Sequence, residues 1–207
     1  MSLGSGWAAI KREWSQRQLA DPQWAFLWEA PPAGEWVALD VLASGRDAAH
    51  DRLLAVAAVR VAAVRVAADR VLASQRLELN LAPTGADAAG QADADRTAMA
   101  QLLQFIGPRP IVGYYLDFDL ALIERAAQPL LGTGLPQPRI DVSALFHDWK
   151  FRQLPPYQQQ GAVTIDLRWA TLLRELGLPE RESATPLDHA VQAGLAFVVL
   201  RHRLGLA

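Results

Sequence analysis

The sequence has no cysteine, no excess of basic residues and no long hydrophobic run. Without cysteine, a disulfide-stabilised scaffold, a thiolate metal site and a cysteine nucleophile are all excluded. The 20 Lys and Arg are balanced by 22 Asp and Glu, so any binding of nucleic acid must be local. The longest uncharged apolar runs, Leu53–Val59 and Gly194–Leu200, fall far short of the roughly 20 residues that a membrane-spanning helix needs.

What is present points to an ordinary folded protein. Hydrophobic residues make up 51% of the 207 residues and the net charge is only −2, which argues against intrinsic disorder. No basic and apolar leader opens the chain. We therefore predict a cytoplasmic protein with no membrane segment, in which an arm (residues 1–33) precedes one main domain (residues 34–207).

The arm is rich in tryptophan. Aromatic and apolar residues recur at helical spacing over residues 7–20, which predicts an amphipathic helix. The aromatic strip at residues 24–28 is too short for a helix and ends before Pro31-Pro32. Two interpretations are open: the arm packs on the main domain, or its tryptophans form a surface for a partner protein or a second copy of the chain.

The main domain reads as three strands followed by alternating helices and strands. This order predicts an α/β fold with a mixed sheet, in which an antiparallel three-strand meander is joined by parallel strands and flanked by helices. Residues 83–94 are rich in Gly, Ala and Asp and are predicted to form a surface loop. The predicted strands are 36–41, 53–66, 71–79, 110–115 and 140–142, and the predicted helices are 95–106, 119–131, 143–149, a helix capped by Asp166, and 187–204.

A tandem repeat interrupts the second predicted strand. Ala57–Val61 is followed by the identical stretch Ala62–Val66. Because side chains alternate along a strand, five extra residues would reverse the face of everything downstream. The repeat must therefore be absorbed by a bulge, by a longer hairpin or by coiling.

Three stretches carry the candidate chemistry. The first is Trp36–Arg46, which contains Asp40; the second is Ile111–Ile123, which contains Asp119. The third begins Leu187-Asp188-His189-Ala190. In order and spacing these stretches resemble the three exonuclease motifs of the DnaQ-like (DEDD) 3′–5′ exonucleases, which have a ribonuclease-H-like fold.

The resemblance extends over most of the chain. Arg139–Leu145 is similar to the segment that follows the family's second motif, and Asp166–Pro179 is similar to its penultimate helix. What the resemblance implies is a nuclease acting on the ends of single-stranded DNA or RNA. Two Mg²⁺ or Mn²⁺ ions, held about 4 Å apart by four carboxylates, would bind the scissile phosphate and activate a water.

This sequence departs from the family's pattern. Asp40 and Asp119 match the first and the second-motif aspartates, but Leu42 stands where the family has Glu. The best alignment of the third motif places His189 at the last metal-binding aspartate. A shift by one residue would place Asp188 there instead, and one residue turns a helical side chain by about 100°.

Two outcomes follow from these departures. The candidate catalytic residues are Asp40, Asp119, Asp188 and His189, and a single ion bound by Asp40, Asp119 and His189 would prefer Mn²⁺ to Mg²⁺. The expected function is therefore a 3′–5′ exonuclease with impaired or lost activity. The alternative is a pseudo-nuclease module that binds nucleic acid or protein without catalysis.

Residues near the motifs are candidates for substrate contact. The resemblance places Ala43, Ser44 and Gly45 beside the terminal nucleotide, and Tyr115 and Phe118 are candidates for base stacking. Core packing is the competing interpretation for these aromatic side chains. Further candidates for stacking are Tyr114 and Trp149, and those for phosphate contact are Lys150, Arg152 and Arg168.

Overall fold

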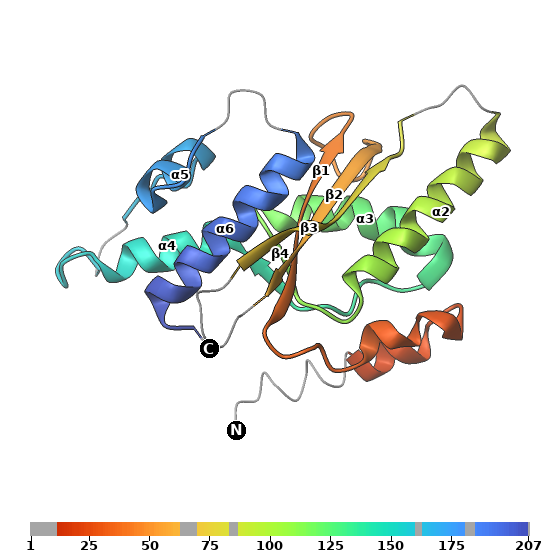
Figure 1. Ribbon diagram of the computed structural model, residues 1–207, viewed down its shortest axis with the longest axis horizontal. Helices are drawn as coiled ribbons and strands as arrows, with labels where there is room; N and C mark the ends of the chain where they lie inside the picture. Colours follow the sequence, from red (N-terminus) through yellow and green to blue (C-terminus); the bar gives the residue numbers. More distant parts are fainter. Residues whose placement is uncertain (1–11, 63–69, 83–86, 160–162, 181–184, 207) are drawn as a thin grey trace.

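The chain folds around a mixed sheet, which is shown in the computed structural model of Figure 1. The structure describes residues 12–62, 70–82, 87–159, 163–180 and 185–206. Within these residues, one sheet has the strand order β3-β2-β1-β4-β5. The strands are β1 (Glu35–Ala43), β2 (Leu53–Ala62), β3 (Arg70–Asn80), β4 (Ile111–Gly113) and β5 (Arg139–Asp141).

The directions of the strands agree with the prediction. β1 pairs antiparallel with β2, and β2 pairs antiparallel with β3. β4 pairs parallel with β1, and β5 pairs parallel with β4. The predicted α/β fold, with a meander and added parallel strands flanked by helices, is confirmed.

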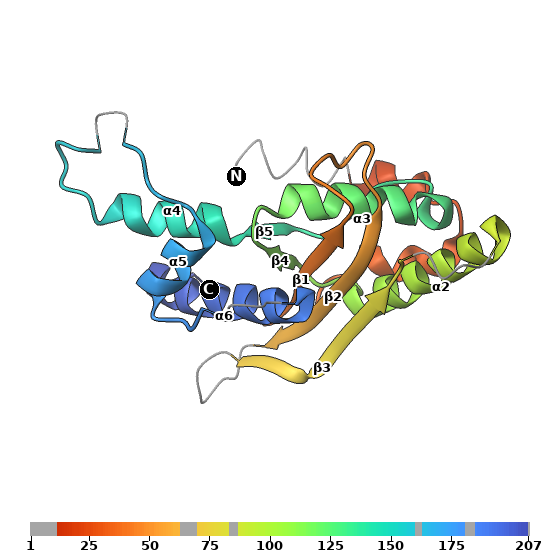
Figure 2. The ribbon, with the colours of Figure 1, turned by 90° about the horizontal axis from the view of Figure 1, so that it is seen from above.

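Helices cover both faces of the sheet. Figures 1 and 2 show α4, α5 and α6 on one side of the sheet and α2 and α3 on the other. The elements are the 3₁₀ helix η1 (Pro22–Trp28), α2 (Ala88–Ile106), α3 (Leu116–Leu131), α4 (Val142–Arg152), α5 (Trp169–Leu176) and α6 (Pro186–Leu204). None of the described helices is long and apolar enough to cross a membrane.

β1 separates two hydrophobic cores. Val37 and Leu39 point into the core shared with α2 and α3, whereas Ala38 points into the core shared with α6. Asp40 is therefore on the α6 face, near the carboxyl end of the strand. The strand thus presents a carboxylate at the edge of an otherwise apolar layer.

A glycine lets α6 lie close to the sheet. A Cβ on Gly194 would come within 3.1 Å of Val71 Cγ2, 3.2 Å of Val61 Cγ2 and 3.3 Å of Ala38 Cβ. Any larger side chain would push the helix away from β1 and β2. The position of the first turn of α6 beside Asp40 depends on this close approach.

Part of the arm packs into the main core. Trp24, Leu27 and Trp28 are buried in the cluster formed with α2 and α3. They lie on η1, so the prediction that the aromatic strip is too short for a helix was wrong. The predicted helix over residues 7–20 is described only from residue 12 and is helical over residues 12–17, where Trp14 is exposed.

Other predicted boundaries need correction. α2 begins at Ala88, so residues 88–94 are helical rather than part of a loop. The N-cap of α5 is Arg168, and Asp166, two residues before it, accepts a hydrogen bond from the Arg168 amide rather than from an amide of the helix. Tyr115 follows β4 and caps α3, so it is not in the strand.

The tandem repeat is described only in part. Its first copy lies in β2, and residues 63–66 of the second copy lie outside the described residues. The pairing of β2 with β3 shifts register: Val59 pairs with Arg76, but Arg60 pairs with Leu72. The extra residues of this bulge therefore lie in β3.

Candidate functional site

The motif residues meet at one edge of the sheet. Asp40 lies near the end of β1, Asp141 ends β5, Asp119 is in the first turn of α3, and His189 is in the first turns of α6. Parallel strands end at the same edge, so the helices that follow them begin beside one another. The fold thus gathers residues from positions 40 to 189.

A histidine and a carboxylate bridge α6 to β1. His189 Nδ1 lies 3.3 Å from Asp40 Oδ2. A carboxylate can only accept hydrogen bonds, so Nδ1 carries the proton in this contact. The hydrogen bond to Asp40 raises the pKa of His189. Burial raises the pKa of Asp40, although the hydrogen bond and charge of His189 oppose this shift.

Asp119 is the most unusual carboxyl group of the site. Only 6% of the residue is exposed, and its Oδ2 atom is buried with no hydrogen-bond partner among the described residues. Burial, together with the negative charges of Asp40 and Asp141, raises the pKa of Asp119 to about 8. Asp119 is therefore predominantly a neutral carboxylic acid at pH 7.

Asp141 adds a negative charge that the motif search did not select. Its Oδ1 accepts hydrogen bonds from the Ser143 amide (2.8 Å) and hydroxyl (2.6 Å), and its Oδ2 accepts one from the Leu116 amide (3.0 Å). It thereby ties the start of α4 to the start of α3. The signal that would have indicated it is its place at the end of a strand parallel to β1.

The structure places Asp188 and His189 differently. Asp188 Oδ2 accepts hydrogen bonds from the Thr185 amide (3.1 Å) and hydroxyl (2.9 Å), which forms a capping box at the start of α6. The next residue, His189, is the one that faces Asp40. Of the two candidates, the structure brings only His189 into contact with the β1 carboxylate.

The donor set does not fit a pair of divalent cations. Leu42, which shares the face of Asp40, is 51% exposed and offers no oxygen ligand. Asp40 is engaged by His189, whose imidazole stands where a further carboxylate would be needed. In the part of the chain that the structure describes, no group of three or more His, Asp and Glu residues is arranged to hold a metal ion.

The candidate substrate residues are two aromatic side chains after β4 and three residues at the end of β1 and in the turn that follows it. Tyr115 is 52% exposed and lies beside Tyr114, with ring centroids 4.5 Å apart, whereas Phe118 is half-buried against the core. Ser44 Oγ donates to Asp51 Oδ1 (2.8 Å) and accepts from the Arg52 amide (2.9 Å), so it fixes the β1–β2 hairpin.

The residues beside Ser44 differ in exposure. Ala43 is half-buried against the core shared with α2 and α3, and Gly45 is exposed. Among the substrate candidates, Tyr115 is the exposed aromatic ring nearest in sequence to Asp119.

An aromatic row continues from Tyr115 toward the bridge. The ring centroids of Tyr114 and Trp169 are 4.6 Å apart, and the rings of Trp169 and His189 are nearly perpendicular, with centroids 6.4 Å apart. The Tyr114 hydroxyl donates to the Leu167 carbonyl (2.7 Å). Trp169, which the motif search did not select, thus restricts the orientation of the His189 ring.

The predicted phosphate contacts are engaged within the protein. Lys150 pairs with Glu175 (2.7 Å), Arg152 with Asp148 (2.6 Å), and Arg168 with Asp166 (2.7 Å). The ring of Trp149 lies under the guanidinium of Arg203, 4.5 Å away. Asp117 is exposed, with its nearest cation at 3.5 Å in Arg139.

Comparison of the sequence with protein-family models and with curated proteins found no match.

Proposed function

We propose that the protein is a divergent DnaQ-like, ribonuclease-H-like domain that binds the 3′ end of single-stranded nucleic acid beside Asp40, Asp119 and His189, and that its phosphodiester hydrolysis is impaired. The observation that carries the proposal is the contact between His189 and Asp40, 3.3 Å long, because it joins the first and third motifs. The strand order and the position of Asp119 at the start of α3 also support it.

The same contact favours a second candidate function, which is binding without hydrolysis. His189 occupies the position where the family's pattern has a carboxylate, and Leu42 presents an apolar side chain beside Asp40. The site therefore carries a histidine–carboxylate bridge in place of a cluster of anionic oxygens. The domain would then bind a nucleic-acid end or a protein partner at this site as a pseudo-nuclease module.

Binding and hydrolysis are tested on the same 5′-labelled oligonucleotides, one DNA and one RNA. We expect salt-sensitive binding by fluorescence anisotropy, weakened by Tyr115→Ala because an exposed ring contributes about 1–3 kcal/mol per stacked base. A double-stranded blunt oligonucleotide is the matched control and should bind more weakly. Absence of any oligonucleotide binding would contradict the nucleic-acid proposal.

Hydrolysis is followed on a gel with Mg²⁺ or Mn²⁺ added. We expect slow or undetectable shortening from the 3′ end. Shortening that persists in the Asp40→Ala/Asp119→Ala double variant would identify a contaminant. Rapid Mg²⁺-dependent shortening that the double variant abolishes would show full activity and overturn the proposal of impaired hydrolysis.

A further inference from the structure

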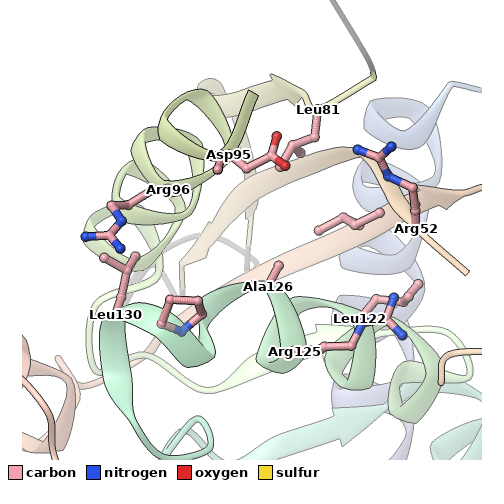
Figure 3. Close-up of a pocket in the computed structure, with 11 residues that line it drawn as sticks. Arg52, Leu81, Asp95, Arg96, Leu122, Arg125, Ala126 and Leu130 are labelled. Carbon is pink, nitrogen blue, oxygen red and sulfur yellow. The ribbon is translucent and has the colours of Figure 1, made fainter. Parts of the chain in front are cut away.

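A pocket lies between α2 and α3, over the start of β2 and the end of β3. Its volume is about 340 Å³, and Figure 3 shows the side chains around it. Its lining residues are Arg52, Leu53, Leu81, Ala92, Asp95, Arg96, Leu122, Arg125, Ala126, Pro129 and Leu130. None of the candidate catalytic residues is among them, so the pocket is distinct from the Asp40–His189 site.

The floor of the cavity is apolar. Leu53, Leu81 and Leu122 are buried members of the core between the sheet and the helices. Ala126 and Leu130 line the wall on α3, one helical turn apart. A bulky apolar side chain of a ligand would bury its surface against these leucines and leave water, which is favourable.

The rim of the cavity is cationic. Figure 3 shows Arg96 on α2 and Arg52, the residue before β2, at opposite ends of the pocket. Among the described residues, neither of these guanidinium groups has an ion-pair partner. Asp95 is the acidic lining residue, and its Oδ1 accepts a hydrogen bond from Gln91 Nε2 (2.8 Å).

Arg125 adds a fixed positive charge. Its guanidinium donates hydrogen bonds to the main-chain carbonyls of Ala48 and Asp51 in the β1–β2 hairpin. The carbonyl partners hold the group in place without neutralising it, although the negative charge of Asp47 also acts on it. With Arg52 and Arg96 the rim carries more positive than negative charge and attracts anions, and planar guanidinium groups suit the oxygens of carboxylates and phosphates.

A proline supplies a hydrogen-bond acceptor on the same wall. Pro129 lies inside α3 and has no amide hydrogen. The Arg125 carbonyl, four residues earlier, therefore lacks the helical donor that it would otherwise have. An amide N–H of a bound chain can donate to this carbonyl, whereas neither a fatty acid nor a phosphate carries such a donor.

We propose that this pocket binds a short acidic and apolar peptide segment of a partner protein. The apolar side chains of the segment rest on the leucine floor. Its flanking carboxylates pair with Arg52 and Arg96, and a main-chain amide donates to the Arg125 carbonyl. Buried apolar anchors supply the affinity and the charged rim orients the segment.

The test uses the full chain and a fluorescein-labelled probe peptide with the sequence Gly-Asp-Glu-Leu-Phe-Glu-Asp. Anisotropy should show saturable binding, and replacing the acids by Lys, or Leu-Phe by Ala-Ala, should abolish it. Arg96→Glu should weaken binding by about tenfold or more, because it replaces an attractive charge by a repulsive one. Arg17→Glu makes the same charge change at an exposed residue of the arm and should alter binding by less than about twofold.

A charge-neutral variant separates insertion from surface attraction. Ala126→Leu fills the pocket without touching the rim and should weaken binding by about tenfold or more. Unchanged binding in Ala126→Leu, or equal loss in Arg17→Glu and Arg96→Glu, would overturn the proposal. So would displacement of the probe by decanoate, or by a single-stranded oligonucleotide, at a lower concentration than by unlabelled peptide.

Discussion

Asp119 gives the sharpest test of the site, because its electrostatics can be measured through stability. The substitution Asp119→Asn keeps the shape of the side chain and removes its ionisation. The pKa of the folded-state carboxyl is raised from 3.8 to about 8, mainly by burial. The folded protein therefore binds a proton at Asp119 more tightly than the unfolded chain does, over the interval from about pH 4 to pH 8.

The sign of the effect follows directly. A raised carboxyl pKa contributes stability that is fully present below the unfolded-state value of 3.8 and is lost as the pH rises to about 8. Each pH unit in this interval lowers the free energy of unfolding of the wild type by about 1.4 kcal/mol through this group. Asn does not titrate, so the stability of the variant relative to the wild type rises by that amount with each pH unit. The accumulated rise from pH 4 reaches about 5 kcal/mol near pH 8.

The assay is urea denaturation of both proteins at half-unit pH steps from 4.5 to about 8. The informative quantity is the difference in free energy of unfolding between the variant and the wild type, plotted against pH. Its slope reports the titration of Asp119, because the buried amide of Asn contributes the same amount at every pH. Asp117→Asn is the matched control, because Asp117 is on the same helix but its side chain is 93% exposed. Parallel pH profiles for wild type and Asp119→Asn would refute the reasoning.

Three further predictions test the surroundings of the site. Gly194→Val should lower the free energy of unfolding by about 1–3 kcal/mol in urea, because α6 must move off the sheet, and unchanged stability would contradict the close approach. Tyr115 has φ 49°, so Tyr115→Gly should be more stable than Tyr115→Ala by about 1 kcal/mol in the same assay, the reverse of the usual order. The raised pKa of His189 stabilises the fold at acidic pH and ceases to do so as the pH rises through it, so His189→Ala should lower the melting temperature more at pH 5.5 than at pH 8.5. An equal loss at both values would argue against a charged bridge to Asp40.

The sheet was predictable because each strand carries its own signal. β1 alternates between two faces of the sheet, and Ser44 and Gly45, which follow it, set its limit. The order of strands and helices then restricts the topology. The bulge in β3 was not predictable at its position, because it depends on pairing between strands and the repeat drew attention to β2.

The errors at helix starts have a common physical cause, since local hydrogen bonds rather than apolar periodicity set those boundaries. Residues 88–94 have no apolar stripe, yet Asp87 accepts a hydrogen bond from the Gly90 amide and the alanines favour helix. The aromatic strip behaves similarly: Asp21 accepts from the Gln23 amide and Pro22 opens η1. In both cases the capping aspartate was the available signal.

Local hydrogen bonds at the helix start also explain why Asp188 and His189, the two candidates of the third motif, have different roles in the structure. Thr185 caps α6, so the residue three positions later turns back toward the cap, and that residue is Asp188. His189, turned by a further 100° or so, then faces the sheet. A protonated imidazole in the first turns of a helix opposes the helix dipole, so it needs a nearby negative charge. Asp40 Oδ2 lies 3.3 Å from His189 Nδ1 and supplies that charge. A histidine at this position of α6 therefore requires the carboxylate on β1, and the two residues together distinguish this site.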